Sequence, residues 1–194
     1  MRLLAFGDSF VAGVGDPEHR GWIGRALAGR AEVTLYNLGV RRDTSADVAR
    51  RWSAEADARL TDIEACGIVF SFGRNDASPA EDGGSRLTPS ESLKNAHRLL
   101  SEGARRAPVM MVGPPPADEP ALAARLEGLN EAFKVLCVRL RVPYVDVLRP
   151  LAVSRTWLDE AAAGDGAHPG AGGYQQMANL IAVHPAWRRF TGLD

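Results

Sequence analysis

The 194-residue sequence has little of two residue types that mark particular classes of protein. It has two cysteines, Cys66 and Cys137, without C-x-x-C spacing, so we expect two free core thiols rather than a disulfide or metal site. Lysine occurs only at Lys94 and Lys134, and 23 Lys and Arg balance 24 Asp and Glu. Because binding to a phosphate backbone requires a clustered basic excess, we expect no nucleic-acid partner.

Long apolar runs are also missing. The first run, residues 3–6, ends at Gly7 and Asp8, which is shorter than the roughly 7 to 15 residues of a signal-peptide core. Nowhere do about 18 apolar residues follow one another, as a membrane-spanning helix requires. We therefore expect no membrane insertion and a cytoplasmic location.

The composition that remains is that of an ordinary globular protein, with 45% hydrophobic and 24% charged residues. Internal repeats, low-complexity tracts and linkers are not evident. The length is that of one domain, so we expect a single domain over residues 1–194.

Five short runs rich in apolar and β-branched residues predict strands, and segments with helical periodicity separate them. The runs are nearly continuous rather than alternating, which predicts that helices cover both faces of the sheet. With right-handed crossovers this gives an α/β fold with a five-stranded, mostly parallel, flavodoxin-like sheet. The predicted strands are residues 3–6, 33–38, 67–72, 109–112 and 143–147.

Helix start signals support this order. Capping-box patterns at residues 44–47 and 88–91 each precede an amphipathic segment. Leucines spaced three or four apart predict the longest helix over residues 117–141. Two stretches, residues 77–89 and 154–169, are predicted to be irregular.

Polar motifs follow four of the predicted strands. In an open α/β sheet the ligand crevice lies outside the carboxyl ends of the strands, so these motifs are expected to converge on one rim. They are Gly7-Asp8-Ser9-Phe10, Asn37-Leu38-Gly39, Gly73-Arg74-Asn75-Asp76 and Asp165-Gly166-Ala167-His168-Pro169.

Ser9 is the candidate nucleophile, and a serine needs a neighbouring base to accept its proton. We choose His168 because Asp165 precedes it by three residues, and the Gly-Ala spacer lets this carboxylate fold back onto one ring nitrogen. The remaining histidines are assigned structural or solvated positions in a loop and in helices. They are His19, His97 and His184.

Attack on a carbonyl also produces an oxyanion, which requires hydrogen-bond donors. Gly39 allows close backbone approach of its N–H, Asn75 offers a side-chain amide, and the backbone N–H of Ser9 is a third donor. Asp76 is expected to hold its own loop in place.

The ordered set of motifs resembles the SGNH, or GDSL-type, hydrolase family, whose blocks carry Ser, Gly, Asn and His in that order. Ser9, Gly39, Asn75 and His168 match these blocks, and Phe10 stands where many members have Leu. The resemblance runs from Gly7 to Pro169. It implies a three-layer α/β/α fold and a serine esterase without metal or cofactor. Ser9, His168 and Asp165 would then be catalytic, and Ser9, Gly39 and Asn75 would form the oxyanion hole.

Three alternatives remain open from the residues alone. A flavin- or phosphate-binding module could use the same layout, although Asp8 would lie beside the bound anion. A metallohydrolase could use the acidic side chains of the motifs, although His168 is the only well-placed histidine. The same fold could also transfer acyl groups to another acceptor or bind carbohydrate.

Substrate choice is the least defined expectation. The crevice walls are expected from residues 11–20, 77–87, 114–116 and 154–163, which form no evident long aliphatic or aromatic channel. We therefore expect a small-molecule ester with a short acyl group, acetylated sugars included. The oligomeric state stays open.

Overall fold

Five parallel strands form the centre of the computed structural model, which describes residues 1–81 and 83–192. Asp82, inside the predicted loop 77–89, and residues 193–194 of the predicted single domain lie outside the described residues. In spatial order the strands are β2 (Thr34–Gly39), β1 (Arg2–Gly7), β3 (Cys66–Ser71), β4 (Val109–Val112) and β5 (Tyr144–Val145).

Strand β1, which lies between β2 and β3, has apolar side chains on both faces. Because successive strand residues point to opposite faces, Leu4 and Phe6 enter one core, and Leu3 and Ala5 enter the other. All four are fully buried. A strand placed in the middle of the sheet and covered twice must be apolar throughout, which is the pattern that predicted it.

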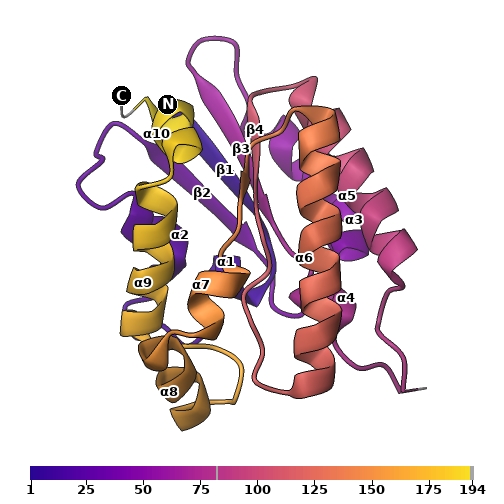
Figure 1. Ribbon diagram of the computed structural model, residues 1–194. Coiled ribbons are helices and arrows are strands. Elements are labelled where there is room, and N and C mark those ends of the chain that lie inside the picture. The colour runs from indigo at the N-terminus through magenta and orange to yellow at the C-terminus, as the bar shows by residue number, and fades with distance from the viewer. Residues whose placement is uncertain (82, 193–194) are drawn as a thin grey trace.

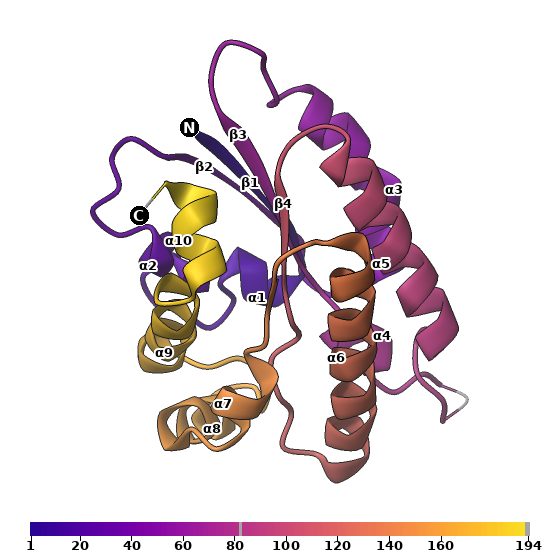
Figure 2. The ribbon, with the colours of Figure 1, turned by 45° about the horizontal axis from the view of Figure 1, so that its top comes forward.

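Helices cover both faces and make the fold a three-layer sandwich (Figures 1 and 2). On one face lie α3 (Ser45–Asp57), α5 (Pro89–Ala104) and α6 (Pro120–Leu140). On the other lie α2 (Gly21–Ala26), α9 (Ala171–Ala182) and α10 (Pro185–Thr191). The helices α1 (Ser9–Ala12), α4 (Arg74–Ala77) and α7 (Leu148–Ala152) follow the ends of β1, β3 and β5, and α8 (Arg155–Ala163) follows α7.

Both predicted capping boxes are present. The Thr44 hydroxyl accepts a hydrogen bond from the backbone N–H of Asp47, whose carboxylate accepts from the backbone N–H of Thr44. Thr88 and Glu91 do the same at the start of α5. Such side chains satisfy backbone donors that have no partner inside the helix, which fixes where each helix begins.

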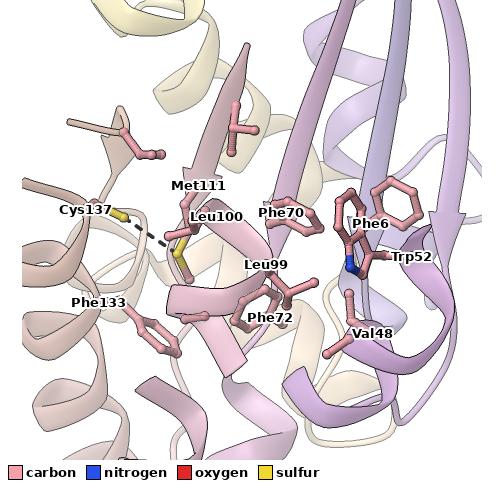
Figure 3. Packing of buried hydrophobic residues seen from close by; sticks show 14 of the residues in the cluster. Phe6, Val48, Trp52, Phe70, Phe72, Leu99, Leu100, Met111, Phe133 and Cys137 are labelled. Atoms are coloured by element: carbon pink, nitrogen blue, oxygen red, sulfur yellow. Dashed lines mark hydrogen bonds between the residues drawn. The ribbon is translucent and has the colours of Figure 1, made fainter. Parts of the chain in front are cut away.

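The core on the side of α3, α5 and α6 is aromatic (Figure 3). The rings of Phe6 and Trp52 meet edge to face, with centroids 6.3 Å apart. Nearby, the thiol of Cys137 lies 3.8 Å from the Met111 sulfur. Both cysteines are free, as predicted, but Cys66 is half-buried rather than a core residue.

The structure differs from the sequence-based prediction in several elements, among them β5, which spans Tyr144–Val145 rather than residues 143–147. The stretch 154–169, predicted to be irregular, contains α8, which Ser154 caps and which buries Trp157 and Ala161 one turn apart. Helix α10 was not predicted, and its fully buried Trp187 packs against Trp22. Strand β2 is half-exposed because it is an edge strand with one neighbour.

Across residues 1–81 and 83–192, none of the helices is both long enough and apolar enough to cross a bilayer.

Candidate active site

The side chains of Ser9, His168 and Asp165 form a continuous chain of hydrogen bonds. The Ser9 Oγ lies 2.7 Å from Nε2 of His168, across 159 positions of sequence. On the other side of the ring, Nδ1 of His168 lies 2.8 Å from Oδ2 of Asp165. A neutral imidazole with its proton on Nδ1 satisfies both contacts, donating to Asp165 and accepting from the Ser9 hydroxyl.

The imidazole is carried by the segment that joins α8 to α9. The Oδ1 atom of Asp165 accepts hydrogen bonds from the backbone N–H groups of Ala167 at 3.0 Å and His168 at 2.9 Å, which leaves Oδ2 for the ring. Gly166 has a φ of 79°, a left-handed conformation that glycine adopts without strain. The Gly-Ala spacer thus folds Asp165 back onto the histidine.

The serine follows directly from the end of β1. Asp8 caps α1, with Oδ1 accepting from the backbone N–H of Phe10 at 3.0 Å, and Ser9 is the first helical residue. Gly7 has no room for a side chain, because a Cβ would lie 2.0 Å from the carbonyl oxygen of Ser71. Ser9 is 4% exposed, so neighbouring residues pack around its side chain at the end of β1.

Aromatic side chains to which the sequence analysis assigned no role lie close to the imidazole. The Phe10 ring lies 4.6 Å from the His168 ring, centroid to centroid, and Trp157 stacks on Phe10 at 6.1 Å. The Tyr174 hydroxyl donates to the carbonyl oxygen of Val14 at 2.7 Å, which ties the segment after α1 to α9. The only signal in the sequence was the aromatic residue directly after Ser9.

Asn75 and Gly39, the other two predicted site residues, both lie against Asp8 and both have hydrogen-bond partners. Asn75 Nδ2 donates to the carbonyl oxygen of Asp43 at 3.0 Å and lies 3.4 Å from Oδ2 of Asp8. The Gly39 N–H donates to Oδ1 of Asn37 at 3.1 Å. An oxyanion would therefore have to replace these acceptors.

Gly39 has a packing role that explains the glycine. A Cβ at this position would lie 2.2 Å from the backbone nitrogen of Ala12 and 2.7 Å from the carbonyl oxygen of Asp8. The end of β2 therefore touches the backbone of α1, and no larger residue fits. Asp76 holds its loop, as predicted, because Oδ1 accepts from the backbone N–H of Ser45 at 2.7 Å.

The comparison with protein families matches residues 5–176 to the model of the GDSL-like lipase/acylhydrolase family. The chain belongs to this family. As a member of it, the protein is a hydrolase that acts on ester bonds, and the α/β fold predicted from the sequence is confirmed. Because the chain belongs to this family, the alternative of a flavin- or phosphate-binding module is not supported.

Solved structures support the assignment of the fold. A lipase/acylhydrolase from Enterococcus faecalis is 24% identical, with 99% of this chain and 96% of that chain covered and a TM-score of 0.76. A lipolytic G-D-S-L protein from Veillonella parvula is 20% identical, with 93% and 96% covered and a TM-score of 0.75. A catalytic mutant of an acetylxylan esterase from Geobacillus stearothermophilus is 16% identical, with 100% and 94% covered and a TM-score of 0.73. No curated protein sequence matches the chain.

The electrostatics of this GDSL-like hydrolase separate the two site carboxylates. Burial raises the pKa of Asp8 to about 7, against the hydrogen bond from Phe10. Partial burial also opposes the ionisation of Asp165, but hydrogen bonds from His168 and Ala167 lower its pKa to about 2. Burial lowers the pKa of His168, and its hydrogen bond with Asp165 opposes this shift. His168 is therefore neutral near pH 7 and is able to accept a proton.

A cavity of about 190 Å³ lies beside the turn that carries His168. Two of the four predicted walls, residues 114–116 and 154–163, contribute to it. A separate cavity of about 300 Å³ includes Ala77, Ser85 and Leu87 from the predicted wall 77–87. Neither lining includes Ser9, His168 or Asp165, but the smaller one includes Gly166 and Ala167 of the histidine turn. It is lined by Arg74, Pro116, Ala117, Asp118, Trp157, Leu158, Ala161, Ala162, Gly166 and Ala167.

Among residues 1–81 and 83–192, no group of three or more His, Cys, Asp or Glu side chains is placed to hold a metal ion. The sequence analysis assigned no role to two arginines that lie near the site. Arg41 lies 3.5 Å from Oδ2 of Asp165 and is exposed. Arg74 is buried, with its guanidinium 5.3 Å from the Phe10 ring centroid. The sequence shows that these residues are arginines, but it does not show in which direction their side chains point.

Proposed function

We propose that this GDSL-like hydrolase is a serine esterase that works through an acyl-enzyme on Ser9. His168 is the general base and then the general acid, and Asp165 orients its ring. The observation that carries the proposal is the 2.7 Å contact of the Ser9 Oγ with His168 Nε2, with Asp165 on the opposite ring nitrogen. A serine hydroxyl becomes a nucleophile when a base in this position takes its proton.

The reaction has two halves. The Ser9 Oγ attacks the ester carbonyl carbon while its proton moves to Nε2 of His168. The carbon–oxygen bond to the alcohol then breaks, and the alcohol leaves with that proton. A water molecule next gives a proton to Nε2 and adds to the acyl group, and the carboxylic acid leaves as Ser9 regains its proton.

The oxyanion of each tetrahedral intermediate would accept hydrogen bonds from the backbone N–H groups of Ser9 and Gly39 and from Asn75 Nδ2. Donors placed in this way typically contribute about 100- to 1,000-fold each to the rate. Asn75 and Gly39 would then donate to a negatively charged oxygen instead of to the neutral carbonyl oxygens of Asp43 and Asn37. A hydrogen bond to a charged acceptor is stronger than one to a neutral acceptor. The support for this part is the position of both residues against Asp8.

A short acyl group, such as acetyl, is the substrate class we propose. The cavity beside His168 measures about 190 Å³, which is below the roughly 300 to 1,000 Å³ of sites for drug-sized ligands. Its walls include the small residues Ala161, Ala162 and Ala167. A hydrolysis series of chromogenic esters with acyl groups of two to sixteen carbons tests this preference, and a maximum at twelve or more carbons would overturn it.

The test of the nucleophile is labelling by an organophosphonate that traps activated serines. We expect wild-type protein to be labelled and Ser9→Ala to fold normally but take no label, because one small hydroxyl is lost at a strand end. Ser90→Ala, which alters an exposed serine of α5, serves as the control and should be labelled like wild type. His168→Ala should abolish turnover. Label on the Ser9→Ala protein would place the nucleophile elsewhere.

A further inference from the structure

Arg74 is a buried arginine without a carboxylate partner. It is 9% exposed, and within the described residues no carboxylate forms an ion pair with it. Arg25, which is also buried, does have such a partner: its Nη2 lies 2.8 Å from Oδ1 of Asp16. Arg74 instead donates from Nε to the carbonyl oxygen of Pro116 at 3.3 Å. Buried charges are normally paired, because an unpaired one loses its hydration without compensation.

The negative groups nearest to Arg74 do not neutralise it. Asp8 and Asp165 attract the guanidinium electrostatically, but neither lies within ion-pair distance of it. Both oxygens of Asp165 are occupied by its own turn and by the imidazole. Asp8 is buried and has a pKa of about 7, so it is only partly ionised at neutral pH. Burial lowers the pKa of Arg74, yet a guanidinium stays protonated in proteins.

Arg74 lines the 190 Å³ cavity beside the histidine turn. Gly166 and Ala167, which immediately precede His168, form part of the same lining, so a group bound there lies beside the turn that carries the imidazole. Most of the remaining walls are apolar. Asp118 is the other charged residue of the lining, and it is exposed. A cation among apolar walls is the arrangement that recognises one anionic group of a small ligand.

We propose that this cavity binds a carboxylate carried by the ester substrate, with Arg74 as its counter-ion, so that the enzyme prefers short esters that bear a second, ionised carboxyl group. The planar fork of a guanidinium matches a carboxylate with two parallel hydrogen bonds. The size of the cavity restricts the carboxylate to a short arm. This inference rests on the proposed function, because it concerns the substrate of the Ser9 site.

Two pairs of esters that differ only in charge test the proposal. Monomethyl succinate and methyl succinamate differ on the acyl side, and acetoxyacetate and acetoxyacetamide differ on the alcohol side. In at least one pair we expect kcat/KM of the wild-type protein to be about tenfold or more higher for the carboxylate than for the neutral amide. The pair that responds shows which part of the substrate enters the cavity.

The variant Arg74→Gln should reduce this preference to less than about twofold, and Arg74→Lys should retain part of it, since an ammonium keeps the charge without the fork. Arg41→Gln is the matched control, because it removes an exposed positive charge beside Asp165 and should leave the ratio unchanged. The melting temperature of each variant shows that it is folded. Competition by succinate, compared with succinamide, gives a second measurement on the unaltered protein.

The outcomes separate this inference from the proposed function. The role of Arg74 would be overturned if the wild-type protein hydrolysed the neutral and the charged ester of each pair equally well. It would also be overturned if the protein hydrolysed neither pair while its Ser9 took the phosphonate label. A preference that persists in Arg74→Gln, or that falls equally in Arg41→Gln, would attribute it to long-range charge attraction instead. Absence of the label on Ser9 would overturn the proposed function itself.

Discussion

The loop at residues 7–10 and the turn at residues 165–168 both place an aspartate beside the Ser9–His168 pair, yet the two carboxylates have opposite properties. Asp165 is 43% exposed and has a pKa of about 2. Asp8 is 2% exposed and has a pKa of about 7. Residue type is the same in both loops, so the difference comes from solvent and from hydrogen-bond donors.

Asp165 accepts from two backbone N–H groups and from the imidazole, all of which favour its charge. Asp8 accepts from the backbone N–H of Phe10, and its second oxygen lies 3.4 Å from Nδ2 of Asn75. Burial therefore has the larger effect on the pKa of Asp8, and hydrogen-bond donors together have the larger effect on the pKa of Asp165. One carboxylate is suited to stabilise an imidazolium, and the other to cap α1 and position Asn75.

Asp165 is the carboxylate whose replacement should impair catalysis most. Asp165→Asn should lower kcat for a short-chain ester by up to about 10,000-fold, because the amide no longer holds the imidazole in the required tautomer. Asp8→Asn should lower kcat far less, since Asp8 touches neither ring nitrogen. Steady-state rates of the two variants measure the contrast. A loss below about tenfold in Asp165→Asn would show that another group orients His168.

The second prediction concerns stability at Asp8. Because its folded-state pKa is raised from 3.8 to about 7, the unfolded chain releases this proton more readily. Asp8 therefore lowers the free energy of unfolding as pH rises from about 4 to 7, by up to about 4 kcal/mol. Asp8→Asn should remove this part of the pH dependence, measured by urea unfolding at pH 4, 6 and 8. Asp118→Asn, at an exposed position, is the control and should change nothing.

The pH dependence of the rate should follow the ionisation of His168, the partner of Asp165. Activity requires neutral His168, so kcat/KM should rise with pH by about tenfold per unit below the pKa of His168 and then level off. Burial lowers that pKa, so the midpoint should lie below 6.5. Rates for a neutral ester between pH 4.5 and 8 give the profile. A flat profile from pH 5 to 8 would contradict histidine as the base.

The smallest expected effect is that of chelation. If Asp8 and Asp165 act as a buried cap and an orienting carboxylate, exhaustive treatment with a chelator should leave the rate unchanged. Activity is measured before and after chelation, with added divalent ions as the control. Lost activity that returns with the ions would assign these acidic groups to a metal instead.

Much of the fold could be predicted because its signals are local. The apolar runs of β1, β3 and β4 and the capping boxes at Thr44 and Thr88 depend on neighbouring residues alone. Helix α8 was missed, although Trp157 and Ala161 already stood at helical spacing, because the Gly-rich end of its stretch masked the pattern. Short elements such as α10 are stabilised by contacts with distant residues, here Trp22, which no local pattern contains.

By itself the sequence determined the order of the strands along the chain and the four motifs that carry Ser9, Gly39, Asn75 and His168, since strand ends and turn residues are local features. The tertiary structure alone decided which groups meet. Only there does Arg74 become a buried cation on the wall of a cavity, and only there do Asp8 and Asp165 acquire different pKa values. The physical reason is that burial and long-range contacts depend on what the rest of the chain packs around a residue.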